Sequence, residues 1–303
     1  MILAVDIGGT SVKLGLVNEY GHILHKHEAS VSFDGYKTPI LETVLKEAQA
    51  FVSEAPWRIS GIGVSATGQI DRVCGLVVGT NGSIPDYEGA PIKQAFEQEF
   101  GVKTTVLNDA NGAALGECYR GAGSGVRNML MVTLGTGVGG GIVIGGKIFT
   151  GWRGLAGEIG HFTLYQDGIP CTCGKRGCFE QYASTTALIR LAQEATGESG
   201  LNGRTIFARA HAADETMLRV LDRWIDDIAA GLSGLVHIFN PRVLVIGGGV
   251  SEQEKLLFEP LRARVFEMIM PRFREGLGIY RAHLGNDAGL IGAAKFFLDE
   301  QKR

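Results

Sequence analysis

The sequence lacks long apolar runs and clusters of basic residues. No stretch reaches the roughly 20 consecutive apolar residues that a membrane-spanning helix needs. Lysine and arginine number 29 against 32 aspartates and glutamates, and a net charge of −3 does not favour nucleic acid or anionic lipid as a partner. The N-terminus, MILAVDIGG, also lacks the basic segment of a signal peptide. We therefore expect a cytoplasmic protein that binds neither a membrane nor nucleic acid.

Cysteine and linker sequence are scarce as well. Five cysteines in 303 residues do not make the disulfide framework of a small secreted protein. No low-complexity segment divides the chain, so any domain boundary must fall where the chain crosses between packed lobes. A chain of this length is sufficient for one large or two ordinary domains, and 45% hydrophobic with 20% charged residues is typical of a soluble globular protein.

Alternating apolar and β-branched residues predict strands, and longer amphipathic runs predict helices. The predicted strands are 2–6, 12–18, 22–30, 58–66, 104–107, 128–134, 142–144, 147–149, 242–246 and 278–281. The predicted helices are 38–53, 94–100, 109–117, 184–196, 203–212, 214–239 and 288–299. The strand, glycine turn and strand of residues 3–17 recur at residues 130–144. This repetition indicates an internal duplication within an α/β fold.

Glycine is abundant, with 45 residues, about twice the average share, and it is clustered in runs. Three of these runs follow predicted strands: DIGGT at 6–10, LGTGVGGG at 134–141 and GGGVSE at 247–252. Because glycine has no side chain, backbone N–H groups in such a turn can approach phosphate oxygens closely. Each run alone could be a simple turn. Together with Asp6, and with Lys13 shortly after it, they favour a nucleotide site.

Two other nucleotide-binding patterns are disfavoured. Residues 135–140 satisfy G-x-G-x-x-G, but a dinucleotide fingerprint requires the glycines to open a helix. The residues that follow, GGIVIGG at 140–146, are β-branched and glycine-rich, which a helix resists. The chain also lacks GxxxxGK[ST] and is therefore not a P-loop enzyme. By contrast, the triple glycine at 247–249 is predicted to open a helix.

One imidazole and three thiols fall within a short irregular segment. His161, Cys171, Cys173 and Cys178 read H-x9-C-x-C-x4-C. Four such ligands complete a tetrahedral zinc shell with no open position for water, so a bound zinc would shape the loop and not activate a nucleophile. The alternatives are unpaired buried thiols or a disulfide, although Cys171 and Cys173 are poorly spaced to bridge each other.

Three carboxylates are candidates for a polar ligand site. Glu158 lies three residues before His161, and Glu180 lies two after Cys178, so a stiffened loop would fix both beside the imidazole. This combination suits a polyhydroxylated ligand, whereas the alternative is that both glutamates are solvated surface charges. Asp109 follows the buried pattern TVLN and would emerge at a strand end, where it could act as a general base. Its alternative role is to cap the following helix.

The motifs resemble those of known families. GEIGH at 157–161 followed by CxCGxxGCxE resembles the ROK family of repressors, open reading frames and sugar kinases. DIGGTSVK, LGTGVGGG and VIGGGVSE are similar to the two phosphate loops and the adenosine motif of the actin, hexokinase and heat-shock-ATPase superfold. The resemblance implies a two-lobed actin-like fold, which is a duplicated ribonuclease H-like fold with an active-site cleft between the lobes. It implies a small lobe of residues 1–118 plus about 286–303, and a large lobe of 119–285 with the zinc loop.

The resemblance also implies roles for individual residues. NDAN at 108–111 matches the catalytic segment of the family, which gives Asp109 the role of general base. The implied sugar-binding residues are Asn81, Asn108, Asp109, Glu158, His161 and Glu180, and His161 would also bind zinc. In the loop of Asn81, Tyr87 takes the place of the family's tryptophan. Asp6 would act on Mg²⁺, and the implied nucleotide-binding residues are Asp6, Gly8, Gly9, Thr10, Lys13, Thr133, Gly135, Thr136, Gly137, Gly139, Gly247, Gly248 and Gly249.

The function implied is ATP-dependent phosphorylation of a hexose hydroxyl, O6 in a glucokinase-like enzyme, with ATP, Mg²⁺ and structural Zn²⁺ bound and with a homodimer as the assembly. N-acetylmannosamine, N-acetylglucosamine, fructose or a β-glucoside is the alternative acceptor. A sugar-responsive transcriptional repressor of the same family is the alternative from another class.

Overall fold

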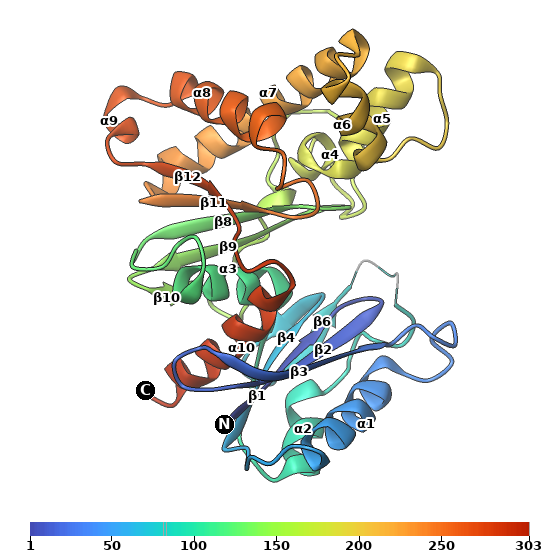
Figure 1. The fold of residues 1–303 in the computed structure, drawn as a ribbon, viewed down its shortest axis with the longest axis vertical. Coiled ribbons are helices and arrows are strands. Elements are labelled where there is room, and N and C mark those ends of the chain that lie inside the picture. The colour runs from blue at the N-terminus through green and yellow to red at the C-terminus, as the bar shows by residue number, and fades with distance from the viewer. Residues whose placement is uncertain (81, 83, 303) are drawn as a thin grey trace. The chain divides into compact units, whose positions relative to one another are not determined.

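Strands and helices alternate along the chain, as predicted, and they form two units in the computed structural model (Figure 1). The structure describes residues 1–80, 82 and 84–302. Unit 1 comprises Met1–Arg127, Gly141–Gly157 and His283–Arg303, and unit 2 comprises Asn128–Gly140 and Glu158–Ala282. The lobe boundaries predicted at residues 118 and about 286 stay a prediction.

Unit 1 is built on a five-stranded sheet with the order β3-β2-β1-β4-β7. Its strands are β1 (Ile2–Ile7), β2 (Ser11–Val17), β3 (Ile23–Ser30), β4 (Gly61–Ala66) and β7 (Thr104–Asn108). Strand β1 is antiparallel to β2 and parallel to β4, which is parallel to β7. The register pairs Ile7 with Ala66 and Ala66 with Asn108, so the three parallel strands end in one row.

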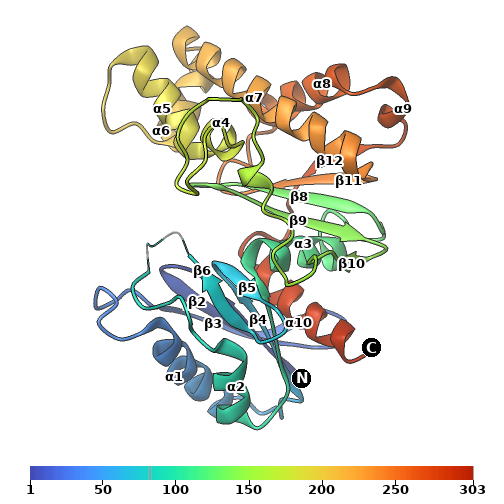
Figure 2. The ribbon, with the colours of Figure 1, turned by 180° about the vertical axis from the view of Figure 1, so that it is seen from behind.

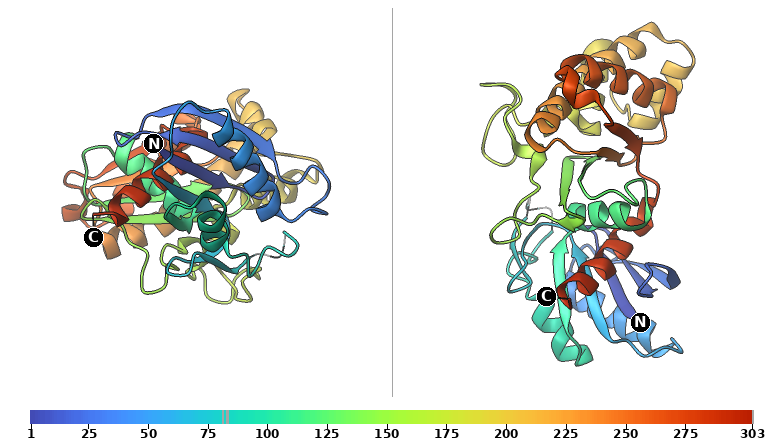
Figure 3. Two further views of the ribbon diagram at one scale, coloured as in Figure 1. Left: turned by 90° about the horizontal axis from the view of Figure 1, so that it is seen from below. Right: turned by 90° about the vertical axis from the view of Figure 1, so that its left-hand side faces the viewer.

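Helices cover both faces of this sheet. Alternate residues of β4 point to opposite faces. Ile62 and Val64 belong to the apolar core that α1 (Ile40–Ser53) and α2 (Ile92–Phe100) cover, whereas the Cα atoms of Gly61 and Gly63 face α10 (Ala288–Glu300). Helix α10 runs along the sheet beside α3 (Asp109–Arg120), as Figure 3 shows. The remaining elements of unit 1 are β5 (Gln69–Asp71), β6 (Leu76–Gly79), β10 (Lys147–Ile148) and the 3₁₀ turn η3 (Gly285–Asp287).

Unit 2 repeats part of this plan. Its sheet has the strand order β9-β8-β11-β12, with β8 (Met129–Leu134), β9 (Val138–Ile144), β11 (Val243–Gly247) and β12 (Gly278–Arg281). The last residues of β9 belong to unit 1, where they pair with β10. Strand β11 is parallel to both β8 and β12. This order matches β2-β1-β4-β7 of unit 1, which is the arrangement that an internal duplication produces.

The helices of unit 2 lie largely on one side of its sheet (Figures 1 and 2). They are α4 (Glu180–Ala183), α5 (Thr185–Thr196), α6 (Gly203–His211), α7 (Glu215–Phe239), α8 (Glu259–Met268) and α9 (Pro271–Arg274), with the 3₁₀ turn η1 (Ile159–His161) and the π-helical η2 (Glu254–Phe258). Asp214 caps α7, because its side chain accepts hydrogen bonds from the amides of Thr216 and Met217. Within the described ranges, no helix is long and apolar enough to cross a membrane.

Two local predictions are wrong, and one hairpin was not predicted. The turn predicted over residues 135–141 is shorter, because β9 begins at Val138 and takes Gly139 to Gly141 into the sheet. The triple glycine does not open a helix directly, since residues 248–252 form turns and η2 begins only at Glu254. The hairpin of β5 and β6, visible in Figure 2, was not predicted, since each strand has only three or four residues.

Candidate functional site

The predicted residues of unit 1 gather at the carboxyl edge of its sheet. Asp6 is on β1, and the glycine turn of Gly8–Thr10 follows that strand. Asn108 ends β7, and Asp109 is the first residue of α3. Because β1 and β7 are separated by β4 alone, their ends lie two strand spacings apart, about 10 Å. The turn after β1 and the Asp109 carboxylate therefore belong to the same edge of the sheet.

Asp6 is fixed by two polar partners. Its carboxylate lies 3.5 Å from Lys13 Nζ and accepts a hydrogen bond of 2.9 Å from Ser65 Oγ. Burial raises the pKa of the Asp6 carboxyl, while Lys13 and Ser65 act in the opposite direction. Gly289 of α10 leaves the space that this carboxylate occupies, since a Cβ there would lie 2.6 Å from the Asp6 Cγ. A partly buried carboxylate with a single nearby lysine fits a magnesium ion, which proteins bind through few carboxylates and several waters.

Asn108, and not Asp109, caps helix α3. The Asn108 Oδ1 accepts from the amide of Asn111, and its Nδ2 donates to the carbonyl of Gly68 at 2.9 Å and to Asp109 Oδ1 at 3.0 Å. The alternative in which Asp109 is the cap is therefore wrong. Asp109 Oδ1 also accepts from the amide of Ala110 at 2.8 Å. These contacts orient the Asp109 carboxylate at the edge of the sheet.

The first glycine turn is closed by backbone hydrogen bonds. The amide of Gly8 donates to the Ser11 carbonyl, the Thr10 carbonyl accepts from Val31, and the Tyr36 hydroxyl donates to the Gly9 carbonyl at 2.8 Å. A Cβ at Gly8 would lie 3.1 Å from the Ser11 oxygen. Any residue other than glycine at position 8 would therefore push the Ser11 carbonyl by a few tenths of an ångström.

The two glycine turns of unit 2 are neighbours. The register pairs Thr133 with Gly247, so the turn at Gly135–Gly137 and the turn at Gly248 leave adjacent parallel strands at the same edge. Gly248 has φ of +99°, and a Cβ there would overlap the Leu134 carbonyl, so only glycine fits. At Gly249, by contrast, no described atom lies within 4 Å of the Cβ position. The Gly249 backbone is thus open to a ligand.

The four predicted metal ligands converge. One ligand atom from each of His161, Cys171, Cys173 and Cys178 lies within 4.8 Å of every other. The Cys173 and Cys178 sulfurs are 3.5 Å apart, and the Cys171 sulfur is 3.7 Å from His161 Nδ1. Tetrahedral zinc with Zn–S of about 2.3 Å places two sulfurs about 3.7 Å apart, so the residues fit the ion.

Of the two alternatives for these cysteines, the disulfide does not agree with the structure. All five cysteines of the chain are unbridged. Burial, followed by contacts with the other sulfurs, raises the pKa of the Cys178 thiol to about 12. A thiolate at this position therefore requires a cation, which a metal ion supplies.

Glu158 and Glu180 lie beside this cluster; Glu180 is half-buried, whereas Glu158 is exposed on the surface. Desolvation by the surrounding atoms raises the pKa of the Glu158 carboxyl, His161 lowers it, and Glu180 raises it. Glu180 is the first residue of α4, and its Oε1 lies 3.9 Å from the Cys171 sulfur. Because Nδ1 of His161 faces Cys171, Nε2 is the ring nitrogen that remains for a ligand.

One predicted residue and one additional side chain belong to the loop between β6 and α2. Asn81 lies outside the described residues. Tyr87 is 2% exposed, and its hydroxyl has no hydrogen-bond partner among the residues that the structure describes. Burial raises the pKa of Tyr87, and the charge of Asp109 raises it further. Sequence reasoning treated Tyr87 only as a replacement for tryptophan, because the loop of residues 79–91 is polar and rich in turn formers and gives no sign that this hydroxyl is buried.

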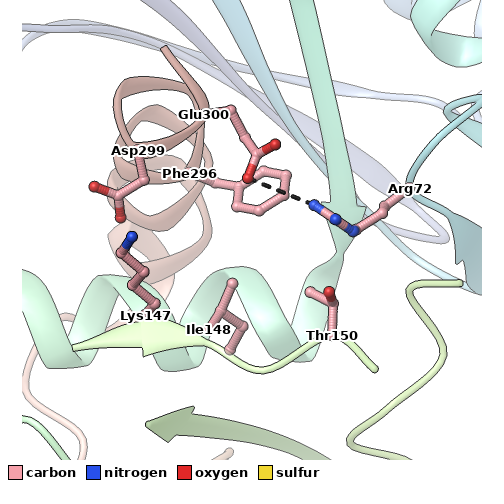
Figure 4. A pocket seen from close by; sticks show the side chains of 7 residues that line it. All are labelled: Arg72, Lys147, Ile148, Thr150, Phe296, Asp299 and Glu300. Carbon is pink, nitrogen blue, oxygen red and sulfur yellow. Dashed lines mark hydrogen bonds and ion pairs between the residues drawn. The ribbon is translucent and has the colours of Figure 1, made fainter. Parts of the chain in front are cut away.

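The structure also has a small hollow away from these residues, beside the C-terminal helix (Figure 4). Arg72, Lys147, Asp299 and Glu300 supply its charges, and Arg72 Nη1 lies 3.5 Å from Glu300 Oε1. A cavity volume of about 10 Å³ is room for a single water molecule. Such a water would satisfy the buried Arg72 Nε, which lacks a partner in the described part of the chain.

Comparison with known proteins gives full-length matches. A model of the ROK family matches residues 2–300. A glucokinase of Thermotoga maritima is 36% identical over 310 residues, which cover 97% of this chain and 96% of the relative.

Two solved structures are similar over the whole chain. A ROK family glucokinase from Streptomyces griseus in complex with glucose and AMPPNP has a TM-score of 0.80 at 34% identity, with 97% of this chain and 98% of that chain covered. A ROK hexokinase from Thermus thermophilus has a TM-score of 0.86 at 32% identity, with 100% and 99% covered. The predicted α/β fold of the two-lobed, actin-like ATPase class is thereby confirmed. The chain belongs to the ROK family.

Proposed function

We propose that this protein is an ATP-dependent hexose kinase that transfers the γ-phosphoryl group of ATP to a sugar hydroxyl, with O6 of glucose as the acceptor. The observation that carries the proposal is the carboxyl edge of unit 1. There a glycine turn and Asp6 share one edge of the sheet with an oriented carboxylate, Asp109, about 10 Å away, so a phosphate-binding turn and a base would face the same substrates.

Asp109 is the proposed general base. Phosphoryl transfer requires alignment of donor and acceptor, neutralisation of charge and removal of the acceptor proton. The amide of Ala110 and the side chain of Asn108 hold one oxygen of the Asp109 carboxylate, which fixes its direction. The carboxylate can then accept the proton of the sugar hydroxyl as the oxygen attacks the γ-phosphorus.

The proposed sugar-binding residues combine carboxylates, amides and an imidazole, which suit the hydroxyl groups of a hexose. They are Asn81, Asn108, Asp109, Glu158, His161 and Glu180. His161 serves twice in this proposal, with Nδ1 on the metal and Nε2 on the sugar.

The proposed nucleotide-binding residues are those of the three glycine turns. They are Asp6, Gly8, Gly9, Thr10, Lys13, Thr133, Gly135, Thr136, Gly137, Gly139, Gly247, Gly248 and Gly249. Asp6 would hold Mg²⁺, which neutralises phosphate charge when bound. Zinc at His161, Cys171, Cys173 and Cys178 is proposed as a structural ion.

Other acceptors and another class of function are outcomes of the same test. The alternative acceptors to glucose are N-acetylmannosamine, N-acetylglucosamine, fructose and a β-glucoside. A sugar-responsive repressor would bind DNA in a salt-dependent manner and release no ADP.

The test is a coupled assay of ADP release with ATP and Mg²⁺ over a panel of these sugars, alongside a DNA mobility-shift measurement. Glucose-dependent ADP release supports the proposal. DNA binding without sugar-dependent ADP release overturns it.

A further inference from the structure

The second phosphate turn is held from behind by the start of helices α4 and α5. The carbonyl of Gly135 accepts a hydrogen bond of 2.8 Å from the amide of Thr185, and the carbonyl of Thr136 accepts one of 2.7 Å from the Thr186 hydroxyl. The amide of Val138 donates to Glu180 Oε2 at 3.0 Å. Residues that lie more than 40 positions later in the chain therefore bind three successive parts of the turn.

These hydrogen bonds decide where the amides of the turn point. In a trans peptide the C=O and N–H bonds are antiparallel. Since the carbonyls of Gly135 and Thr136 face α5, the N–H groups of Thr136 and Gly137 face the opposite way. Two adjacent N–H groups directed away from the protein scaffold are the arrangement that binds a phosphate oxygen.

Glu180 adds a second constraint. A Cβ at Gly137 would overlap Glu180 Oε2, so the carboxylate fills the space directly behind the turn. A carboxylate would repel a nucleotide phosphate if charge alone decided the interaction. The placement is therefore better explained by the hydrogen bond to the Val138 amide, which fixes the end of the turn where β9 begins.

We propose that Thr186 and Glu180 are positioning residues for the nucleotide phosphates, which act by holding the amides of the turn at residues 135–138. This inference rests on the proposed kinase function and assigns Glu180 a task besides contact with the sugar. Thr186 has no place among the proposed ligand-binding residues.

The first arm of the test removes one hydroxyl. Thr186→Val keeps the shape of the side chain and loses the donor to Thr136. Affinity of the full-length protein for ADP and for AMPPNP is measured by titration calorimetry with Mg²⁺ and without sugar. We expect the nucleotide Kd to rise about threefold to tenfold, since one neutral hydrogen bond is lost. Thr186→Ser, which keeps the hydroxyl, should restore the affinity.

The matched control is Thr196→Val. Thr196 is also a residue of α5 whose hydroxyl donates to a backbone carbonyl, that of Ala192 at 2.8 Å, but it lies at the other end of the helix. A general effect of losing such a bond would raise the nucleotide Kd in both variants. The sugar KM and the melting temperature of Thr186→Val should stay close to those of Thr196→Val.

The second arm separates the charge of Glu180 from its hydrogen bond. Glu180→Gln loses the charge but keeps an oxygen for the Val138 amide, whereas Glu180→Ala loses both. We expect the nucleotide Kd to change less than about twofold in Glu180→Gln and to rise about tenfold in Glu180→Ala. If the wild-type protein phosphorylates sugar but the nucleotide Kd is unchanged in Thr186→Val and Glu180→Ala, this inference is overturned while the proposed function stands. Wild-type protein that binds no nucleotide would overturn the proposed function as well.

Discussion

Asp109 is the residue on which the proposed chemistry depends most directly. Its carboxylate is oriented by Asn108 and Ala110 and stands at the edge of the unit 1 sheet. Asp109→Asn removes the basic group but keeps the size of the side chain. We expect kcat to fall by about 10²–10⁴ while sugar binding and the melting temperature stay close to wild type. Steady-state kinetics and sugar titration of the purified variant check this, and near-wild-type kcat would remove Asp109 from the mechanism.

Asp71 and Arg153 form a second residue-scale feature, away from the proposed chemistry. The Arg153 guanidinium donates to Asp71 Oδ2 at 3.0 Å, while the amides of Val73 and Cys74 donate to the other oxygen. Arg153 is the main cause that lowers the pKa of Asp71. The pair fastens the segment that leads to Glu158 onto the β5–β6 hairpin.

This pair predicts a pH-dependent stability. The pKa of Asp71 is lower in the folded state than in the unfolded state. The ionised carboxylate therefore contributes its full stabilising free energy above the unfolded-state pKa of about 3.9, and this stabilisation is lost as the pH falls through the folded-state pKa. Arg153→Gln should cost about 1 kcal/mol at pH 7, and the difference from wild type should shrink below about pH 4.

Thermal unfolding at pH 7 and pH 3 measures this difference. Arg219→Gln is the control, since the Arg219–Glu215 pair is highly exposed at 3.8 Å and contributes little. An Arg153→Gln defect of equal size at both pH values would contradict the assignment.

At the scale of elements, the crossing of α3 and α10 depends on glycine. A Cβ at Gly292 would overlap the backbone oxygen of Gly112, and one at Gly116 would overlap that of Ala288. The two helix backbones therefore approach closely, side by side in Figures 1 and 2. Clustered glycine was interpreted from the sequence as backbone that approaches ligands, but these glycines serve helix packing.

Gly292→Ala should destabilise the protein by about 2–3 kcal/mol, because the added methyl group overpacks a backbone contact that cannot move aside. The matched control is Gly234→Ala in helix α7, where no described atom outside the helix lies within 4 Å of the Cβ position. That variant should gain about 0.5–1 kcal/mol from helix propensity. Chemical denaturation of both variants gives the comparison, and a neutral Gly292→Ala would mean that the helices separate without cost.

At the scale of the whole molecule, the metal cluster should contribute to stability. We expect elemental analysis of freshly purified protein to find about one zinc per chain. Cys173→Ser should lose the metal and lower the melting temperature by at least about 5 °C, since binding free energy at a structural site adds to folding. Cys74→Ser is the control, because Cys74 is likewise exposed and unbridged but lies outside the cluster. If the protein without bound metal has the same melting temperature as the protein with metal, the structural role of the metal is contradicted.

The homodimer, the cytoplasmic location and the lobes of residues 1–118 with about 286–303 and 119–285 stay predictions at this scale. Light scattering of the purified protein at several concentrations measures the assembly. Limited proteolysis with and without sugar would locate the boundaries between lobes, because cleavage concentrates where few contacts cross.

The sequence alone determined the features that depend on neighbours along the chain. Most strands and helices followed from periodicity, and the cluster of one histidine and three cysteines was predictable because its four residues lie within an 18-residue segment. The place of Asp109 at a strand end was predictable for the same reason. The sequence did not show, however, that Asn108 and not Asp109 caps helix α3. Both residues are good caps, and only the backbone geometry selects one.

The tertiary structure decided which distant residues meet. Sheet register brings the end of β1 close to the end of β7, about 100 positions later, and Glu180 reaches the amide of Val138 across 42 positions. Such contacts arise from strand pairing and close packing, to which local periodicity gives no clue. For the same reason, the sequence alone does not distinguish the glycines of the α3–α10 crossing from those of the turns that follow β1, β8 and β11.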